Sequence, residues 1–86
     1  MRLLWEERAW GDYLYRQTQD KKTLKRINAL IKDIQRSPFE GIGKPEPLKG
    51  NLSCLWSRRI DDINRIVYYE QDETVYIIAC KGHYES

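Results

Sequence analysis

Three short runs in the second half of the chain restrict its fold more than any other feature. CLWSRRI, NRIVYYE and TVYIIACK occupy residues 54–60, 64–70 and 74–81, and all three are rich in β-branched and aromatic residues. Only the turn-forming segments DDIN and QDE separate them. Because connections this short join antiparallel neighbours, the runs predict a three-stranded antiparallel meander.

Two amphipathic helices are expected before this meander. The first runs from Glu6 to about Gln19, and its stripe consists of Trp10, Tyr13, Leu14 and Gln17. Asp20 is a plausible N-cap for the second helix, whose apolar face consists of Leu24, Ile27, Leu30, Ile31 and Ile34. This helix should end at Ser37, because the residue before Pro38 is steered away from the α region.

The order of the elements defines the expected fold class. RLLW, at residues 2–5, is typical of a first strand. Two helices cannot bury both of their apolar stripes alone, so the helix pair needs a sheet to cover. The sequence therefore predicts an α+β fold of order β-α-α-β-β-β, with both helices on one face of a small, mostly antiparallel sheet. With 86 residues, the chain is expected to form a single domain, 1–86.

The composition argues against several classes of protein. No apolar run approaches the roughly 18 residues needed to span a bilayer, and the N-terminus has no apolar signal segment. Cys54 and Cys80 form no C-x-x-C pair, and the chain has a single histidine. We therefore expect a cytoplasmic protein with two reduced, half-buried thiols, no zinc site and no cofactor.

The net charge of +2 is unevenly distributed. Residues 21–36 carry six basic side chains and one acid, whereas residues 66–86 carry one basic side chain and four acids. A concentrated basic surface suits contact with a polyanion such as RNA. The alternative is an ordinary solvated helix face or a protein partner contact.

The segment SPFEGIGKPEPLKGN is rich in Gly and Pro, and long loops of this kind are often functional. Pro45 has a fixed φ, and Pro47 restricts Glu46 to an extended backbone. Rigid placement suits a catalytic carboxylate, and Lys44 and Lys49 lie close enough in sequence to tune its pKa or hold an anion. A solvent-exposed linker acid is the alternative.

Arg59 and Arg65 form a second candidate group. If the hairpin is centred on Asp62, the two arginines lie opposite each other on one sheet face. Two adjacent arginines repel, so the pair implies an acidic neighbour or a phosphate between them, which arginine binds with two parallel hydrogen bonds. The alternative is ordinary ion pairing with Asp61, Asp62 or Glu70.

His83 and Tyr84 follow the last predicted strand. Histidine is a natural general acid or base near neutral pH, and an exposed tyrosine can stack on a nucleobase. Together with Glu46 and the arginines, they form a set suited to metal-free RNA cleavage. A two-residue turn at residues 72–73 would place Arg65 and His83 on opposite faces. A longer turn, a bulge or a curled tail is then needed to bring them together.

The segment GKPEPLKGNLSCLWSRRIDDINRIVYY, followed by ACKGHY, closely resembles the YoeB/Txe group of bacterial toxins in the RelE/ParE superfamily. Residues 3–49 are also similar to that group, so the resemblance covers nearly the whole chain. It implies a RelE/YoeB-like microbial RNase fold and a ribosome-dependent endoribonuclease, or mRNA interferase. Members of this group cut mRNA in the ribosomal A site and leave a 2′,3′-cyclic phosphate and a 5′-hydroxyl.

The resemblance also implies roles for individual residues. Glu46 corresponds to the general base, His83 to the general acid, and Arg65 to the residue that stabilises charge on the scissile phosphate. Lys49 and Arg59 have supporting electrostatic roles. Tyr84 corresponds to the tyrosine that helps position the substrate base. Many relatives end at the His-Tyr pair, whereas this chain continues with Glu85 and Ser86.

The expected partners are a cognate YefM/Axe-like antitoxin, the ribosome with its mRNA, and a second copy in a homodimer. We expect the antitoxin to dock on the second helix and the C-terminal region. Two alternatives use the same fold without catalysis: a ParE-like toxin that acts on DNA gyrase, or an RNA-binding or partner-binding module. The presence of both Glu46 and His83 argues against the ParE-like alternative.

Overall fold

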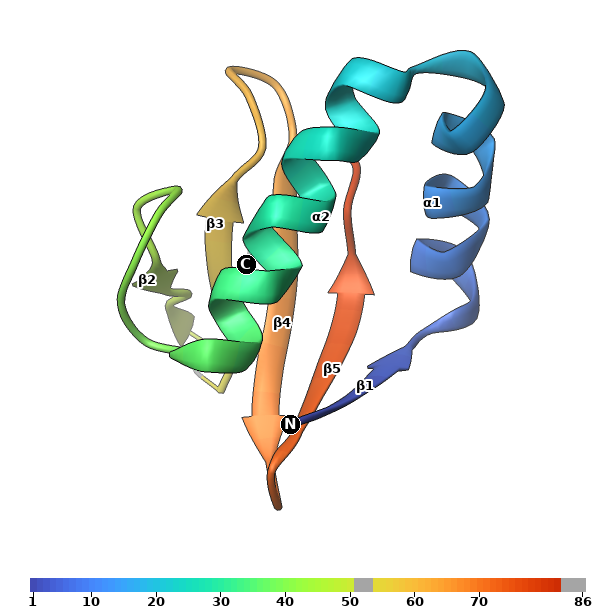
Figure 1. Ribbon diagram of the computed structural model, residues 1–86. Coiled ribbons are helices and arrows are strands. Elements are labelled where there is room, and N and C mark those ends of the chain that lie inside the picture. The colour runs from blue at the N-terminus through green and yellow to red at the C-terminus, as the bar shows by residue number, and fades with distance from the viewer. Residues whose placement is uncertain (51–53, 83–86) are drawn as a thin grey trace.

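The structure of the protein is a computed structural model that describes residues 1–50 and 54–82. Two helices lie on one face of a five-stranded sheet (Figure 1). The elements are β1 (Arg2–Trp5), α1 (Glu7–Gln19), α2 (Lys21–Arg36), β2 (Glu46–Pro47), β3 (Trp56–Arg59), β4 (Arg65–Gln71) and β5 (Thr74–Ala79). The strand order is β1-β5-β4-β3-β2; only β1 and β5 pair in parallel, and the other pairs are antiparallel. The predicted α+β architecture is confirmed.

One strand was not predicted. The segment expected to be only a loop contains β2, where Glu46 pairs with Ser57 and Pro47 with Trp56. Two residues are too few to show a strand periodicity in a sequence. Pro47 is tolerated because β2 is an edge strand, on which a missing N–H costs no ladder hydrogen bond.

The boundaries of α2 agree with the sequence prediction. The Asp20 carboxylate accepts a hydrogen bond from the Thr23 N–H at 3.1 Å, as an N-cap does. The helix ends at Arg36, and Ser37 has an extended backbone ahead of Pro38.

The main core lies between the helices and the sheet. From α2 it includes Ile27, Leu30, Ile31 and Ile34; from the strands it includes Ile66, Tyr68, Val75 and Ile77. The inward face of α1 differs from the prediction. Ala9 and Arg16 are its buried residues, whereas Trp10, Leu14 and Gln17 are exposed. The predicted stripe was shifted because an arginine is not counted as a buried residue unless its partners are known.

The β4–β5 hairpin contains the irregularity that the sequence could not locate. Asp72 and Glu73 form a two-residue turn with left-handed φ values of 53° and 58°. The pairing then shifts between Tyr68↔Ile77 and Val67↔Ala79, so β5 carries a bulge with one additional residue. The bulge reverses the alternation of β5. A bulge is one of the three alternative features, any one of which would meet the expectation for Arg65 and His83, although His83 itself lies outside the described residues.

The cysteines differ from the expected pair of half-buried thiols. Cys54 is exposed, whereas Cys80 is fully buried, and burial raises the pKa of its thiol to about 11. Within the described parts of the chain, no helix is long and apolar enough to cross a membrane.

Candidate active site

The face of the sheet that the helices leave open carries Glu46. In the strand registers, Glu46 pairs with Ser57, Ser57 with Val67, and Val67 with Ala79. Cross-strand partners share a face, so these four residues form one row across the sheet. A second apolar cluster marks the same face, formed by Leu55, Val67 and Ala79 with Leu48, Tyr69 and Ile78 packed against it.

Arg59 and Arg65 lie on this open face too. Each is two residues along its strand from a member of the row, Ser57 or Val67, and residues two apart share a face. They pair directly with each other in the β3–β4 register, which confirms the sequence prediction. The sheet thus brings a carboxylate and two guanidinium groups to a single surface.

Sheet geometry indicates how far apart these groups lie. Glu46 and Arg65 are separated by two strand spacings and two residues, so their backbones are about 12 Å apart. Glu46 and Arg59 are on adjacent strands and about 8 Å apart. Long side chains that extend over the face can therefore contact opposite sides of one phosphodiester.

The two arginines do not form the ordinary ion pairs considered as the alternative. Among residues 1–50 and 54–82, the ion pairs are Arg36–Asp33 and Arg58–Asp33, and neither Arg59 nor Arg65 takes part in one. The Arg65 Nη1 group donates instead to backbone carbonyls of its own hairpin, at 3.2 Å to Asp61 and 3.4 Å to Asn64. Two adjacent cations without a paired carboxylate favour an anion as their ligand.

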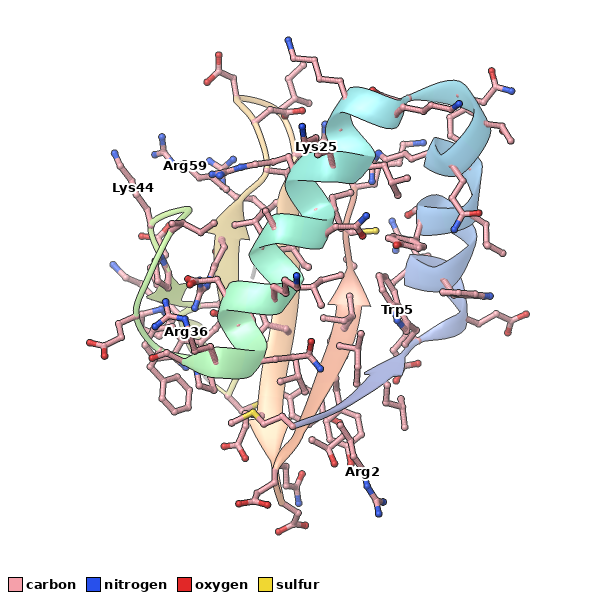
Figure 2. The ribbon with its side chains drawn as sticks, viewed as in Figure 1. Arg2, Trp5, Lys25, Arg36, Lys44 and Arg59 are labelled. Atoms are coloured by element: carbon pink, nitrogen blue, oxygen red, sulfur yellow. The ribbon has the colours of Figure 1, made fainter. Side chains whose placement is uncertain are left out.

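Lys44 lies at the same end of the sheet. The Gly43 carbonyl accepts a hydrogen bond from the Arg59 N–H at 2.6 Å, which fixes the loop beside β3. Gly43 and Lys44 both have a left-handed backbone, with φ of 81° and 52°. A Cβ at position 43 would meet Leu30 Cδ2 at 2.7 Å, so the close approach requires glycine. In Figure 2 the Lys44 and Arg59 side chains both extend outward at this edge.

Lys49 is exposed in the short segment that follows β2. The Leu48 N–H donates to the Leu55 carbonyl at 2.9 Å, so the pairing of the two segments continues one residue past the end of β2 and ahead of the start of β3. His83, Tyr84, Glu85 and Ser86 lie outside the described residues. The chain is described as far as Gly82, whose carbonyl accepts a hydrogen bond from the Arg65 N–H at 3.0 Å.

Arg58 supports the site from the opposite face, and sequence reasoning missed it. The side chain is fully buried and donates to the Asp33 carboxylate at 2.5 Å and to the Tyr68 hydroxyl at 3.1 Å. It also donates to three carbonyls of the loop after α2, those of Ser37, Glu40 and Ile42. Hydrogen bonds from Arg36, from Arg58 and from the Ile42 N–H hold the pKa of Asp33 well below its usual range. Arg58 therefore holds the loop that leads to Glu46.

One signal in the sequence could have identified this role. In WSRRI, strand alternation places Arg58 and Arg59 on opposite faces, so one of them must point toward the helices. A buried arginine requires an acid and several acceptors, and Asp33 is the one acid in α2.

Comparisons with known proteins show the family and support the fold. Residues 5–84 match the family model described as the YoeB-like toxin of bacterial type II toxin-antitoxin systems. Toxin YoeB of Escherichia coli K12 is 57% identical over 84 residues, which cover 98% of this chain and all of that protein. The YoeB dimer from Staphylococcus aureus superposes with a TM-score of 0.91 at 46% identity, covering 98% of both chains. The toxin of the heterotetrameric YoeB-YefM complex from the same organism gives a TM-score of 0.90, again at 46% identity and 98% coverage of both chains.

Proposed function

Since the chain belongs to the YoeB family and is a toxin of a bacterial type II toxin–antitoxin system, we propose that it is a ribosome-dependent endoribonuclease. In this proposal it cuts mRNA in the ribosomal A site and so stops translation. One observation supports the chemistry most directly: the sheet places Glu46, Arg59 and Arg65 on one open face, and neither arginine forms an ion pair with a carboxylate of the described residues.

The reaction is an internal transesterification. Glu46 takes the proton of a ribose 2′-hydroxyl, and the 2′-oxygen attacks the adjacent phosphorus. The phosphorane that forms carries additional negative charge, which Arg65 stabilises with support from Arg59 and Lys49. His83 gives a proton to the 5′-oxygen as the P–O5′ bond breaks. The products are a 2′,3′-cyclic phosphate and a 5′-hydroxyl.

The remaining site residues bind the substrate. Tyr84 provides an aromatic ring on which a base of the cut codon stacks. Lys44 lies beside Arg59 at the edge of the sheet and contributes positive charge along the RNA backbone. The bulge in β5 supports a common site, because it supplies the change of face that sequence reasoning required.

The protein acts in the cytoplasm with three kinds of partner. A cognate YefM-like antitoxin neutralises it, by analogy with the YoeB-YefM complex from Staphylococcus aureus. We expect that antitoxin to cover α2 and the C-terminal region. The ribosome presents the mRNA. A homodimer is expected from the YoeB dimer of the same organism.

The decisive experiment maps the ends produced on translated and on naked mRNA. We expect cleavage on translated mRNA with cyclic phosphate and 5′-hydroxyl ends; 3′-hydroxyl and 5′-phosphate ends would overturn the mechanism. Glu46→Ala and His83→Gln should each abolish cleavage and growth arrest, whereas Glu40→Ala, an acid exposed in the same loop, should act like the parent. Growth arrest that survives both substitutions would favour a non-catalytic ParE-like toxin.

A further inference from the structure

The backbone of Gly82 is held at both of its polar groups by two consecutive residues of the β3–β4 hairpin. Its N–H donates to the Asn64 side-chain oxygen at 2.8 Å, and its carbonyl accepts from the Arg65 N–H at 3.0 Å. Directly after β5, the Cys80 carbonyl accepts a hydrogen bond from Arg16 Nη1 of α1 at 2.5 Å. The chain beyond β5 is thus held by α1 at Cys80 and by the β3–β4 hairpin at Gly82.

Asn64 is itself fixed by the turn that precedes it. Its Nδ2 group lies 3.1 Å from both carboxylate oxygens of Asp61, and its backbone N–H donates to Asp61 Oδ1 at 2.7 Å. Because Nδ2 faces a carboxylate, the amide oxygen must face Gly82, so the orientation of the amide is determined. Burial works to raise the pKa of Asp61, but the hydrogen bonds from Asn64 and Ile63 and the charge of Arg16 outweigh it and the pKa is lowered.

This arrangement links two parts of the proposed site. Arg65, which stabilises the phosphate, follows Asn64 directly, and the proposed proton donor His83 follows Gly82 directly. The same pair of hydrogen bonds therefore sets where the chain toward His83 begins relative to Arg65. Gly82 has a left-handed φ of 73°, so the chain turns at the point where it is held.

We propose that Asn64 is a positioning residue for RNA cleavage: it holds Gly82, the residue directly before the proposed proton donor His83, beside Arg65. The inference rests on the proposed function. Asn64 touches neither the RNA nor the proton that moves. Its contribution is to limit the orientations from which the proton donor can approach, and a small misplacement of a reacting group lowers rates up to a hundredfold.

The test compares Asn64→Ala with Ile63→Ala, a matched truncation of a side chain that is 70% exposed in the same hairpin. Single-turnover cleavage is measured on programmed ribosomes over a range of toxin concentrations. We expect Asn64→Ala to lower the maximal rate by about tenfold or more while the half-saturating concentration stays within about twofold. Ile63→Ala should match the parent in both.

Amide hydrogen exchange of Gly82, measured by NMR without RNA, tests the contact itself. Exchange should become about tenfold faster in Asn64→Ala and remain unchanged in Ile63→Ala. Unchanged exchange, or faster exchange with an unchanged cleavage rate, would overturn the positioning role. If the parent cleaves no RNA, the proposed function fails, and the exchange rates still show whether Asn64 holds Gly82.

A second variant guards against a general loss of structure. Asn64→Asp keeps an acceptor for the Gly82 N–H but places a second carboxylate against Asp61. The charged groups facing this pair are Arg16, Arg65, Lys81, Asp12 and Asp20, and on the α2 side of Asp61 also Lys22 and Arg26. The Gly82 exchange rate of Asn64→Asp should lie between those of the parent and Asn64→Ala, because the acceptor is kept while the two carboxylates repel each other. Its maximal cleavage rate should follow the same order. A cleavage rate that does not follow the Gly82 exchange rate would count against the proposal.

Discussion

Arg58 and Arg59 are consecutive in the chain, yet they lie on opposite faces of the sheet and are used in opposite ways. Arg58 is fully buried on the helix side and donates to a carboxylate, a hydroxyl and three loop carbonyls. Arg59 is exposed on the open side and, within the described chain, has no carboxylate at ion-pair distance. The residue type is the same, and the alternation of the strand decides which arginine supports the fold and which can bind a phosphate.

The next strand repeats this division. Tyr68 faces the helices, fully buried, and its hydroxyl donates to the Pro38 carbonyl at 2.7 Å. Tyr69 faces the open side and stacks on Tyr76, with ring centroids 4.5 Å apart. Across the described residues, no buried side-chain nitrogen or oxygen of the protein lacks a hydrogen-bond partner. The covered face thus satisfies its own polar groups, whereas Arg59 and Arg65 on the open face form no ion pair with a carboxylate of the described residues.

The largest difference is expected from truncating the two arginines in turn. Arg58→Ala leaves Asp33 and the loop carbonyls without their common donor and should lower the free energy of unfolding by about 3–5 kcal/mol. Arg59→Ala should change it by less than about 0.5 kcal/mol. Urea denaturation of both variants measures this. Equal losses would show that burial does not separate the two roles.

Activity should show the reverse order. Arg65→Ala removes positive charge from the proposed phosphate site and should lower cleavage on translating ribosomes by about 10²–10³-fold. Its free energy of unfolding should stay near that of the parent. Arg2→Ala removes the same charge from an exposed strand position and should cleave normally. If both variants lose activity equally, net charge rather than the site is responsible.

The support beneath the site should also be sensitive to acid. The pKa of Asp33 is lowered in the folded protein by hydrogen bonds from Arg36, from Arg58 and from the Ile42 N–H, so the unfolded chain binds its proton more readily. The stabilisation is complete above the unfolded pKa of 3.8 and is lost as pH falls further below it.

Thermal melting measured from about pH 6 down to about pH 2 tests this dependence. The parent should lose stability steeply below about pH 4, whereas Asp33→Asn should start lower and show a flatter profile. Parallel profiles would assign the acid sensitivity to other carboxylates.

Much of this division could be predicted from the sequence. Two features of the sheet could not be predicted, and each has a physical reason. Centring the β3–β4 hairpin on Asp62 correctly placed Arg59 opposite Arg65, and strand alternation put both on one face. It could not reveal β2, which has only two residues. Nor could it locate the bulge in β5, because a bulge follows from packing on both faces and not from local propensity.

The helices show the same limit. The apolar face of α2 was predicted correctly because its four buried residues are all aliphatic. The face of α1 was misplaced because it buries Arg16, whose acceptor, the Cys80 carbonyl, is 64 residues away in sequence. Partners so distant cannot be assigned from one sequence without the fold.

The smallest expected effect on the free energy of unfolding comes from removing the hydroxyl of Tyr68 or of Tyr69. This pair of substitutions compares the covered face with the open face while disturbing the packing least. Tyr68→Phe removes one oxygen, leaves the Pro38 carbonyl and Arg58 Nε without their partner, and should cost about 1–2 kcal/mol of unfolding free energy. Tyr69→Phe removes the same atom from the open face, keeps the stacked ring, and should cost less than about 0.5 kcal/mol. Both changes conserve volume, so urea denaturation reports the hydroxyl alone. A cost at residue 69 equal to that at residue 68 would mean that the open face, too, depends on internal hydrogen bonds for its stability.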